Sequence, residues 1–152
     1  MFERELTAYY DDIFRYCYYR VGSRETAEDL CQDTFVSFLE HRSDYHSRGK
    51  LKNYLYTIAR NKCIDYYRKV DPVCMDMLPE SKQEDWFEET VEIKLLMGKL
   101  PDELKEVIIL RFFQGLKYRE IASILGVGVS KAKYLAAKAL ELLEKEVSSD
   151  AT

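Results

Sequence analysis

The sequence predicts an all-α protein made of two small helical domains joined by an acidic linker. Apolar residues recur at helical spacing before and after the middle of the chain, and no stretch shows the alternation typical of a strand. The middle, residues 71–92, holds eight acidic residues against one lysine, two of the three prolines and no sustained period. We therefore expect domains at 1–70 and 93–152 with a linker at 71–92.

Three helices are expected in the first domain, at 2–19, 24–41 and 50–69, with breaks at "VGS" and "RSDYHSRG". About four more follow, at 85–99, 102–114, 118–125 and 129–147. Pro101 suits a first helical turn, and Gly115 and Gly126 stand where C-terminal caps are expected. The linker reads either as a solvated loop or as a negative segment that lies in a basic groove of a partner.

The composition, with 47% apolar and 33% charged residues, is typical of a soluble globular protein. No run approaches the ~18 apolar residues of a membrane span. The start, "MFERELTAYYDD", is charged where a signal peptide would need an apolar core. We expect a cytoplasmic protein.

The four cysteines, Cys17, Cys31, Cys63 and Cys74, form no C-x-x-C pair, and there are only two histidines. The first three fall on apolar sides of expected helices, which favours reduced core residues. No metal or other cofactor is expected. Because no glycine-rich phosphate loop or nucleophile–base arrangement occurs either, we do not expect an enzyme.

The stretch "AEDLCQDTFVSFLE" has two distinct helical faces. One is expected in the core and combines Ala27, Leu30, Cys31, Thr34, Phe35 and Phe38. The other is an acidic stripe around one valine, namely Asp29, Gln32, Asp33, Val36 and Glu40. Such a stripe is either a solvated face or a partner surface, and the embedded Val36 leans toward a partner.

The stretch "KLKNYLYTIARNKCIDYYRK" has a core side, for which we expect Leu51, Tyr54, Leu55, Ile58 and Ala59. The far side is expected to carry Asn53, Tyr56, Arg60, Ile64 and Tyr67, flanked by Lys52, Asn61 and Arg68. Rings that stack on bases, an amide that reads base edges and cations that neutralise phosphate suit single-stranded nucleic acid. The alternative is that these tyrosines pack on a neighbouring helix.

The stretch "YREIASILGVGVSKAKYLAAKAL" fits a helix-turn-helix, with a plain helical hairpin as the alternative. Small Ala122 lets the two helices approach closely. Gly126 can adopt the left-handed conformation that the turn needs.

Together these stretches resemble the sigma-70 family of bacterial RNA polymerase sigma factors, in particular its two-domain extracytoplasmic-function group. "AEDLCQDTFVSFLE" is similar to the family's A-E-D-L-x-Q-D/E-x-F segment, and "LKNYLYTIARNKCIDYYRK" to its F-x-x-W-L-Y-x-I-A-R-N-x-x-I-D-x-x-R segment. Residues 100–143 are similar to the C-terminal promoter-binding domain. The order and spacing of all three segments match the family.

The resemblance implies that the first domain is sigma region 2 and the second sigma region 4. Docking on the coiled coil of the polymerase β′ subunit would use Asp29, Leu30, Gln32, Asp33 and Phe35, and the pattern of the acidic stripe adds Val36. Recognition of the -10 element and the melted strand would use Asn53, Tyr54, Tyr56, Arg60, Asn61, Asp65 and Arg68, and the far-side pattern adds Tyr67. The loop "HRSDYHSRG" would help to capture a flipped base.

The last helix departs from the family's S-x-x-T-V-K-S-R-L-x-R-A pattern. Gly128 replaces the serine, Leu135 the arginine, and Ala132 and Ala136 the core valine and leucine. The set expected to contact the -35 element shrinks to Ser130, Lys131, Lys133, Tyr134 and Lys138, which predicts a weaker grip on it. A shifted register, with Leu135 buried and Ala136 exposed, is an alternative, as is packing of Tyr134 and Leu135 on the polymerase β flap or an anti-sigma factor.

We expect a sigma factor whose partners are core RNA polymerase, promoter DNA and, as a further candidate, an anti-sigma factor. The net charge of −4 is no objection, because the polymerase supplies much of the basic surface. The alternative is a sigma-like regulator that binds polymerase or DNA without initiating transcription.

Overall fold

The structure is a computed structural model that describes residues 2–41, 51–69 and 97–151. All regular elements in these ranges are helices, which confirms the all-α prediction. The chain divides into two compact units, Met1–Glu84 and Asp85–Thr152. The loop before the third helix, the acidic linker, Cys74 and nearly all of the helix expected at 85–99 lie outside the described residues. Within the described ranges, no helix has the length and apolarity needed to cross a membrane.

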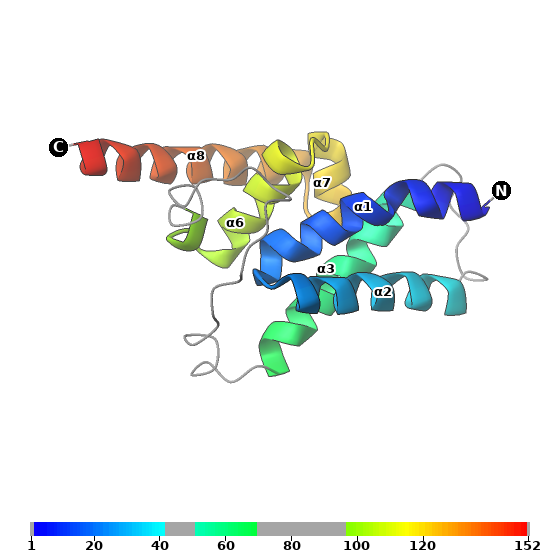
Figure 1. The fold of residues 1–152 in the computed structure, drawn as a ribbon. Coiled ribbons are helices and arrows are strands. Elements are labelled where there is room, and N and C mark those ends of the chain that lie inside the picture. Colours follow the sequence, from blue (N-terminus) through cyan, green and yellow to red (C-terminus); the bar gives the residue numbers. More distant parts are fainter. Residues whose placement is uncertain (1, 42–50, 70–96, 152) are drawn as a thin grey trace. The chain divides into compact units, whose positions relative to one another are not determined.

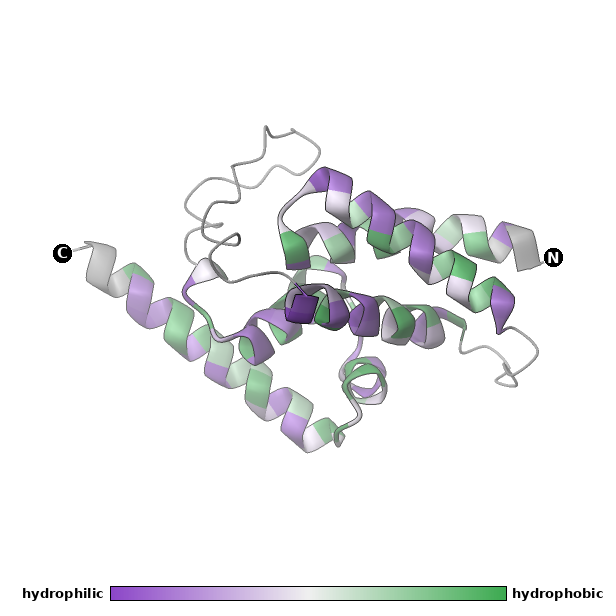
Figure 2. Ribbon diagram, turned by 90° about the horizontal axis from the view of Figure 1, so that it is seen from below, coloured by the Kyte–Doolittle hydropathy of each residue, from purple (hydrophilic) through white to green (hydrophobic). Residues whose placement is uncertain are grey.

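The first unit contains α1 (Phe2–Val21), α2 (Arg24–Glu40) and α3 (Leu51–Lys69), and each of the three packs against the other two (Figure 1). Ser23 caps α2, because its hydroxyl accepts a hydrogen bond from the Thr26 N–H at 3.3 Å. All three helices carry green and purple bands, the amphipathic pattern that the sequence predicts (Figure 2). Their apolar sides form the core of the unit, to which α2 contributes Ala27, Leu30, Cys31, Thr34 and Phe38.

The buried side of α3 differs from the prediction. It consists of Leu51, Leu55, Tyr56, Ala59 and Cys63, whereas Tyr54 and Ile58 are only half-buried. The prediction that Tyr56 lies on the far side is therefore wrong: its side chain is 1% exposed. The helix is rotated about its axis relative to the prediction, because small Cys63 lets this side approach its neighbours closely.

Tyr67 also contacts the first helix, although the sequence placed it on the far side of α3. Its hydroxyl donates a hydrogen bond to the backbone carbonyl of Arg20, near the end of α1. The Arg20 side chain is itself buried, and its Nη1 donates to the Tyr16 hydroxyl at 2.6 Å. A polar network thus joins the C-terminal halves of α1 and α3.

The second unit contains α6 (Asp102–Ile108), α7 (Tyr118–Leu125) and α8 (Val129–Ala151). Both α6 and α7 pack against α8. Their core is formed by apolar side chains from each helix and from the segment before α7, among them Leu104, Val107, Ile108, Leu116, Ile121, Ile124, Ala132, Leu135, Ala136 and Ala139. Pro101 is the N-cap of α6, one residue before the first turn that the sequence suggested for it.

The helix expected at 102–114 changes character halfway. After Ile108 the chain forms a π-helical turn, Ile109–Phe113 (η2), in which the Gln114 N–H donates to the Ile109 carbonyl at 2.9 Å. The added residue in such a turn re-aims the side chains that follow. Phe112 is left 48% exposed, while Ile109 and Leu110 are buried.

The turn between α7 and α8 has the geometry of the predicted helix-turn-helix. Gly126 has a φ of +73°, and its N–H and that of Val127 both donate to the Ala122 carbonyl, at 2.8 and 3.0 Å. Gly115 also adopts a left-handed conformation, with a φ of +71°. Glycine accepts these angles without the steric cost that a Cβ brings. The predicted cap at Gly126 is confirmed, whereas the C-cap before α7 is Gln114, and Gly115 is the residue that follows it.

Candidate functional site

The outer surface of α2 presents all the polar residues that the sequence placed there. Asp29, Gln32, Asp33 and Glu40 are exposed, and Val36 in their middle is 51% exposed. Sequence reasoning missed Leu39, which is 47% exposed and lies one turn beyond Val36. The sequence did contain a signal for it, because a residue three positions after Val36 lies on the same side of a helix. Together these six residues form the outer α2 surface, in which two large apolar groups stand among acids.

Two further residues predicted to bind the polymerase sit deeper. Leu30 is buried in the core of the first unit. Phe35 is half-buried and stacks on Tyr10 of α1, with ring centroids 5.3 Å apart. Leu30 therefore supports the outer α2 surface from beneath, whereas Phe35 borders it.

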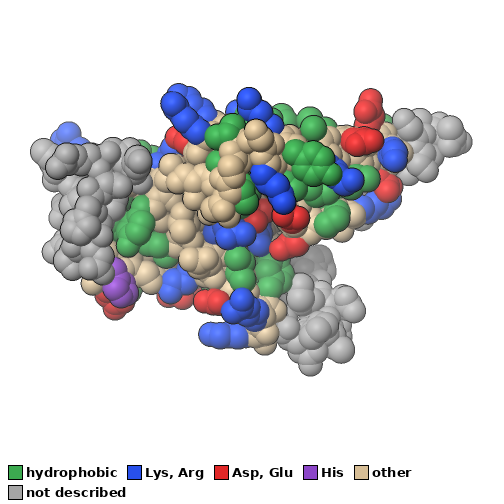
Figure 3. Space-filling view, turned by 180° about the vertical axis from the view of Figure 1, so that it is seen from behind, with side chains coloured by type: hydrophobic (Ala, Val, Ile, Leu, Met, Phe, Trp, Pro, Cys, Tyr) green, Lys and Arg blue, Asp and Glu red, His purple; other side chains and the backbone are tan. Residues whose placement is uncertain are grey.

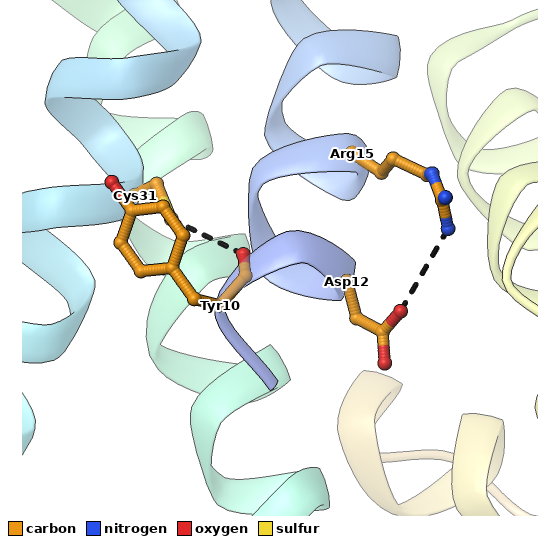
Figure 4. Close-up of polar contacts among 4 residues, drawn as sticks. All are labelled: Tyr10, Asp12, Arg15 and Cys31. Carbon is orange, nitrogen blue, oxygen red and sulfur yellow. Dashed lines mark hydrogen bonds and ion pairs between the residues drawn. The ribbon is translucent and has the colours of Figure 1, made fainter. Parts of the chain in front are cut away.

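Cys31 fastens α2 to α1 below this surface. Its thiol donates to the backbone carbonyl of Tyr10 at 3.7 Å, as Figure 4 shows beside the exposed Asp12–Arg15 ion pair. Burial raises the pKa of Cys31 to about 12. The thiol therefore stays protonated at neutral pH and serves in packing.

Cys17 and Cys63 are likewise free and buried, which confirms the prediction for the three described cysteines. The pKa of Cys17 is raised well above its ordinary value. The larger cause is a hydrogen bond with Cys63, and the second is burial. Within the described ranges, no group of three or more histidine, cysteine or acidic side chains could hold a metal ion.

Three of the predicted DNA-contacting residues are exposed on the outward side of α3, namely Asn61, Asp65 and Arg68. Asp65 and Arg68 form a surface ion pair, with 3.9 Å between Asp65 Oδ1 and Arg68 Nη1. Such a pair contributes little stability, so both groups remain available to a ligand.

Three other predicted residues, Asn53, Tyr54 and Arg60, are half-buried on α3. The Tyr54 ring packs edge-on against Phe38 of α2, with centroids 5.7 Å apart, and this contact holds the ring in place. A ring that is fixed on one side and open on another can stack on a base with little loss of side-chain entropy.

The first half of α8 displays every residue expected to contact the -35 element. Ser130, Lys131, Lys133 and Lys138 are exposed, and Tyr134 is 58% exposed. Leu135 is buried, with 4% exposure, as a shifted register would have it. However, Ala132 and Ala136 are buried as well, so the alternative of a shifted register, in which Ala136 turns outward, is wrong. The helix keeps its register and gains Leu135 as a core residue.

A clamp that the sequence analysis did not anticipate fixes the segment ahead of α7. The Arg111 guanidinium lies 4.2 Å from the centre of the Tyr118 ring, and its Nη1 donates to the Leu116 carbonyl at 3.0 Å. A cation over a ring and a charged donor on a carbonyl are each stabilising. Because the helix ends at Phe113 and α7 begins only at Tyr118, helical spacing gives no signal for the contact between Arg111 and Tyr118.

Charges of both signs are mixed on the surface. On the face drawn in Figure 3, Lys and Arg side chains are interspersed with acidic and hydrophobic ones. With a net charge of −4, the chain has no general electrostatic attraction to DNA.

Two family models match the chain in succession. Sigma-70 region 2 matches residues 6–72, and Sigma-70 region 4 matches residues 90–143. Together these matches take in most of the 152 residues.

Curated relatives agree with these matches. The chain is 33% identical to RNA polymerase sigma factor YlaC of Bacillus subtilis, over 92% of this chain and 88% of that protein. It is 32% identical to ECF RNA polymerase sigma factor BldN of Streptomyces coelicolor, over 99% of this chain and 61% of that longer protein.

Among solved structures, the chain is similar in fold to the sigma factor RpoE of Bartonella quintana, crystallised with the anti-sigma factor NepR. The TM-score is 0.81 at 24% identity, and the match covers 98% of both chains.

Proposed function

This chain belongs to the sigma-70 family, in its extracytoplasmic-function group, and we propose that it binds core RNA polymerase and directs promoter recognition, DNA melting and transcription initiation. It is thus a DNA-binding initiation factor, and we assign it no catalytic residue, since RNA synthesis belongs to the polymerase. We place it in the cytoplasm, where that polymerase works.

The observation that carries the proposal is the outer α2 surface. Val36 and Leu39 expose large apolar side chains although the same helix buries a complete core face, so folding does not account for them. Apolar centres with polar rims are typical of protein interfaces. We assign this surface to the β′ coiled coil, with Asp29, Gln32 and Asp33 as its polar rim.

A division of labour follows for the two parts of the chain. We assign polymerase binding and the -10 element to residues 1–70, and the -35 element to residues 93–152 with the β flap as a neighbouring partner. The acidic linker at 71–92 would run toward the RNA path of the polymerase. An anti-sigma factor is a further proposed partner, since a relative of similar fold was crystallised with one.

The proposed -10 surface is narrower than the sequence suggested. It comprises the exposed and half-buried polar side of α3, that is Asn53, Tyr54, Arg60, Asn61, Asp65 and Arg68. Tyr56 is removed because it lies in the core. Tyr67 is assigned a supporting role through its bond to the Arg20 carbonyl.

Binding of fluorescently labelled chain to purified core RNA polymerase tests the polymerase assignment. Val36→Glu and Leu39→Glu place a charge in the centre of the interface, and we expect each to weaken binding by about 10-fold to 100-fold, the equivalent of about 1.4 to 2.8 kcal/mol. Ala8→Glu, which adds the same charge at an exposed position of α1, is the matched control. Equal binding of all four proteins would refute the assignment of this surface.

A further inference from the structure

The outward side of α8 is arranged in three parallel rows. At ~100° per residue, Ser130, Tyr134 and Ala137 point directly away from the buried Ala132, Leu135, Ala136 and Ala139. We call Ser130, Tyr134 and Ala137 the central row. All three are exposed, and none of them carries a charge.

Lysines stand on both sides of the central row. Lys133 lies on one flank, and Lys131 and Lys138 lie on the other. Two of these lysines, Lys131 and Lys133, lie near the N-terminus of α8, the positive end of the helix dipole. The first turn of α8 contains no acidic residue that would offset their charge. This arrangement is unfavourable in the free protein and becomes favourable when phosphates lie along both flanks.

When a helix lies in the major groove, the centre of its outward side faces the base edges, and the two flanks of that side face the two phosphate backbones. The central row therefore meets the bases. It contains no guanidinium, carboxamide or carboxylate, the groups that make paired hydrogen bonds with guanine, adenine or cytosine. It offers the methyl group of Ala137, the ring of Tyr134 and two hydroxyls, those of Tyr134 and Ser130. Apolar groups such as this methyl group and this ring contact the C5-methyl group of thymine.

We propose that α8 recognises its -35 element through thymine methyl groups, which Tyr134 and Ala137 contact, while Lys131, Lys133 and Lys138 hold the phosphates. This inference rests on the proposed sigma-factor function and adds to it the base chemistry that the helix reads. Ala137 enters here as a specificity residue, and Ser130, whose hydroxyl can bond to any base, adds little discrimination.

The length of the central row limits the element. From residue 130 to 137 the helix rises about 10 Å, the length of about three base pairs. The next residue in the same direction is Glu141, which is exposed and would be repelled by phosphate. The contacted thymines should therefore fall within one window of about three base pairs.

The test uses the full chain bound to core RNA polymerase and promoter fragments selected from a library with a random -35 region and a constant -10 element. Each thymine of the selected element is then replaced by deoxyuridine, which removes the methyl group and keeps the base pair. We expect each contacted position to lose about fourfold in affinity, the equivalent of about 0.8 kcal/mol for one buried methyl group. Thymines outside the window should tolerate the exchange.

Variants connect this effect to the helix. Tyr134→Ala should abolish discrimination between thymine and deoxyuridine at one position, whereas Tyr134→Phe, which keeps the ring, should preserve it. Lys131→Ala should weaken binding to all fragments and reduce the salt slope by about one unit, with the thymine preference unchanged. Lys145→Ala, at an exposed position beyond the row, is the control.

Two results would overturn the inference. The first leaves the proposed sigma-factor function intact, and the second refutes that function as well. If promoter-specific complexes form but bind thymine and deoxyuridine fragments equally, thymine reading by α8 is wrong and the sigma-factor function stands. If no promoter-specific complex forms with active polymerase, the proposed function fails and this inference fails with it.

Discussion

The ring of Tyr56 packs edge-on against the ring of Tyr16, with centroids 5.7 Å apart and planes at 83°. This geometry is favoured for aromatic pairs, and it joins the middle of α3 to α1. Tyr16 in turn accepts a hydrogen bond from buried Arg20. A tyrosine in the segment that resembles the DNA-contacting motif of the family is therefore part of the core.

We predict that Tyr56→Ala destabilises the first unit rather than acting on DNA directly. Loss of a fully buried aromatic side chain costs about 3–5 kcal/mol, through lost burial and the cavity left behind. Urea unfolding followed by circular dichroism measures the change. A variant of normal stability that had lost promoter opening would contradict this placement.

We predict a smaller effect for Tyr67→Phe. This change removes only the hydrogen bond to the Arg20 carbonyl, and the expected loss of stability is about 0.5–1.5 kcal/mol. Tyr134→Phe, at an exposed ring, is the control and should leave stability unchanged. If both variants unfold at the same urea concentration as the parent chain, the bond contributes nothing.

We predict that Gly126→Ala destabilises the second unit by about 1–2 kcal/mol, the cost of placing a Cβ in the left-handed conformation. Space is not the cause, because no atom lies within 4 Å of the position that the Cβ would take. Gly98→Ala meets equally open space without a positive φ, and it should be close to neutral. Equal effects of the two substitutions in thermal unfolding would argue against a conformational cause.

We predict that stability declines in alkaline solution through the buried thiols. The ordinary pKa of cysteine is about 8.5, and burial raises that of Cys31 to about 12. The folded state therefore keeps a proton that the unfolded state releases above pH ~8.5. The free energy of unfolding should be unaffected by this thiol below that pH and fall above it, by up to about 1.4 kcal/mol per pH unit.

Urea titrations at pH 7 and 9.5 measure this decline. Cys31→Ala lowers stability at both values by removing a buried group, but it should make the pH dependence less steep. An unchanged dependence in the variant would show that Cys31 has no part in it.

Much of the fold was predictable because some of the described helices carry their own boundary signals. Ser23 and Gly126 mark a start and an end, and the predicted ends of α2 and α7 agree with the structure to within one residue. The two faces of α2 were predicted correctly apart from two residues, since its acids and most of its apolar residues separate cleanly around the axis. Leu39, an apolar residue on the polar side, was missed, and Phe35, expected in the core, is only half-buried.

The face of α3 was not predictable from periodicity. Its tyrosines are apolar enough for a core and polar enough for a surface, so several rotations about the axis fit the sequence equally well. Small Cys63 and the partner ring of Tyr16, which lies 40 residues away from Tyr56, decide the rotation. The π-helical turn at Ile109 was missed for a similar reason, because tertiary packing of Ile109 and Leu110 overrides local spacing.

Transcription with purified core RNA polymerase and this chain on a library of random promoters, with the RNA starts sequenced, tests the sigma-factor function most directly. We expect starts downstream of a shared pair of -10-like and -35-like elements, and none with polymerase alone. A stable complex that yields no starts would contradict this expectation and would indicate a sigma-like regulator that binds the polymerase without initiating transcription.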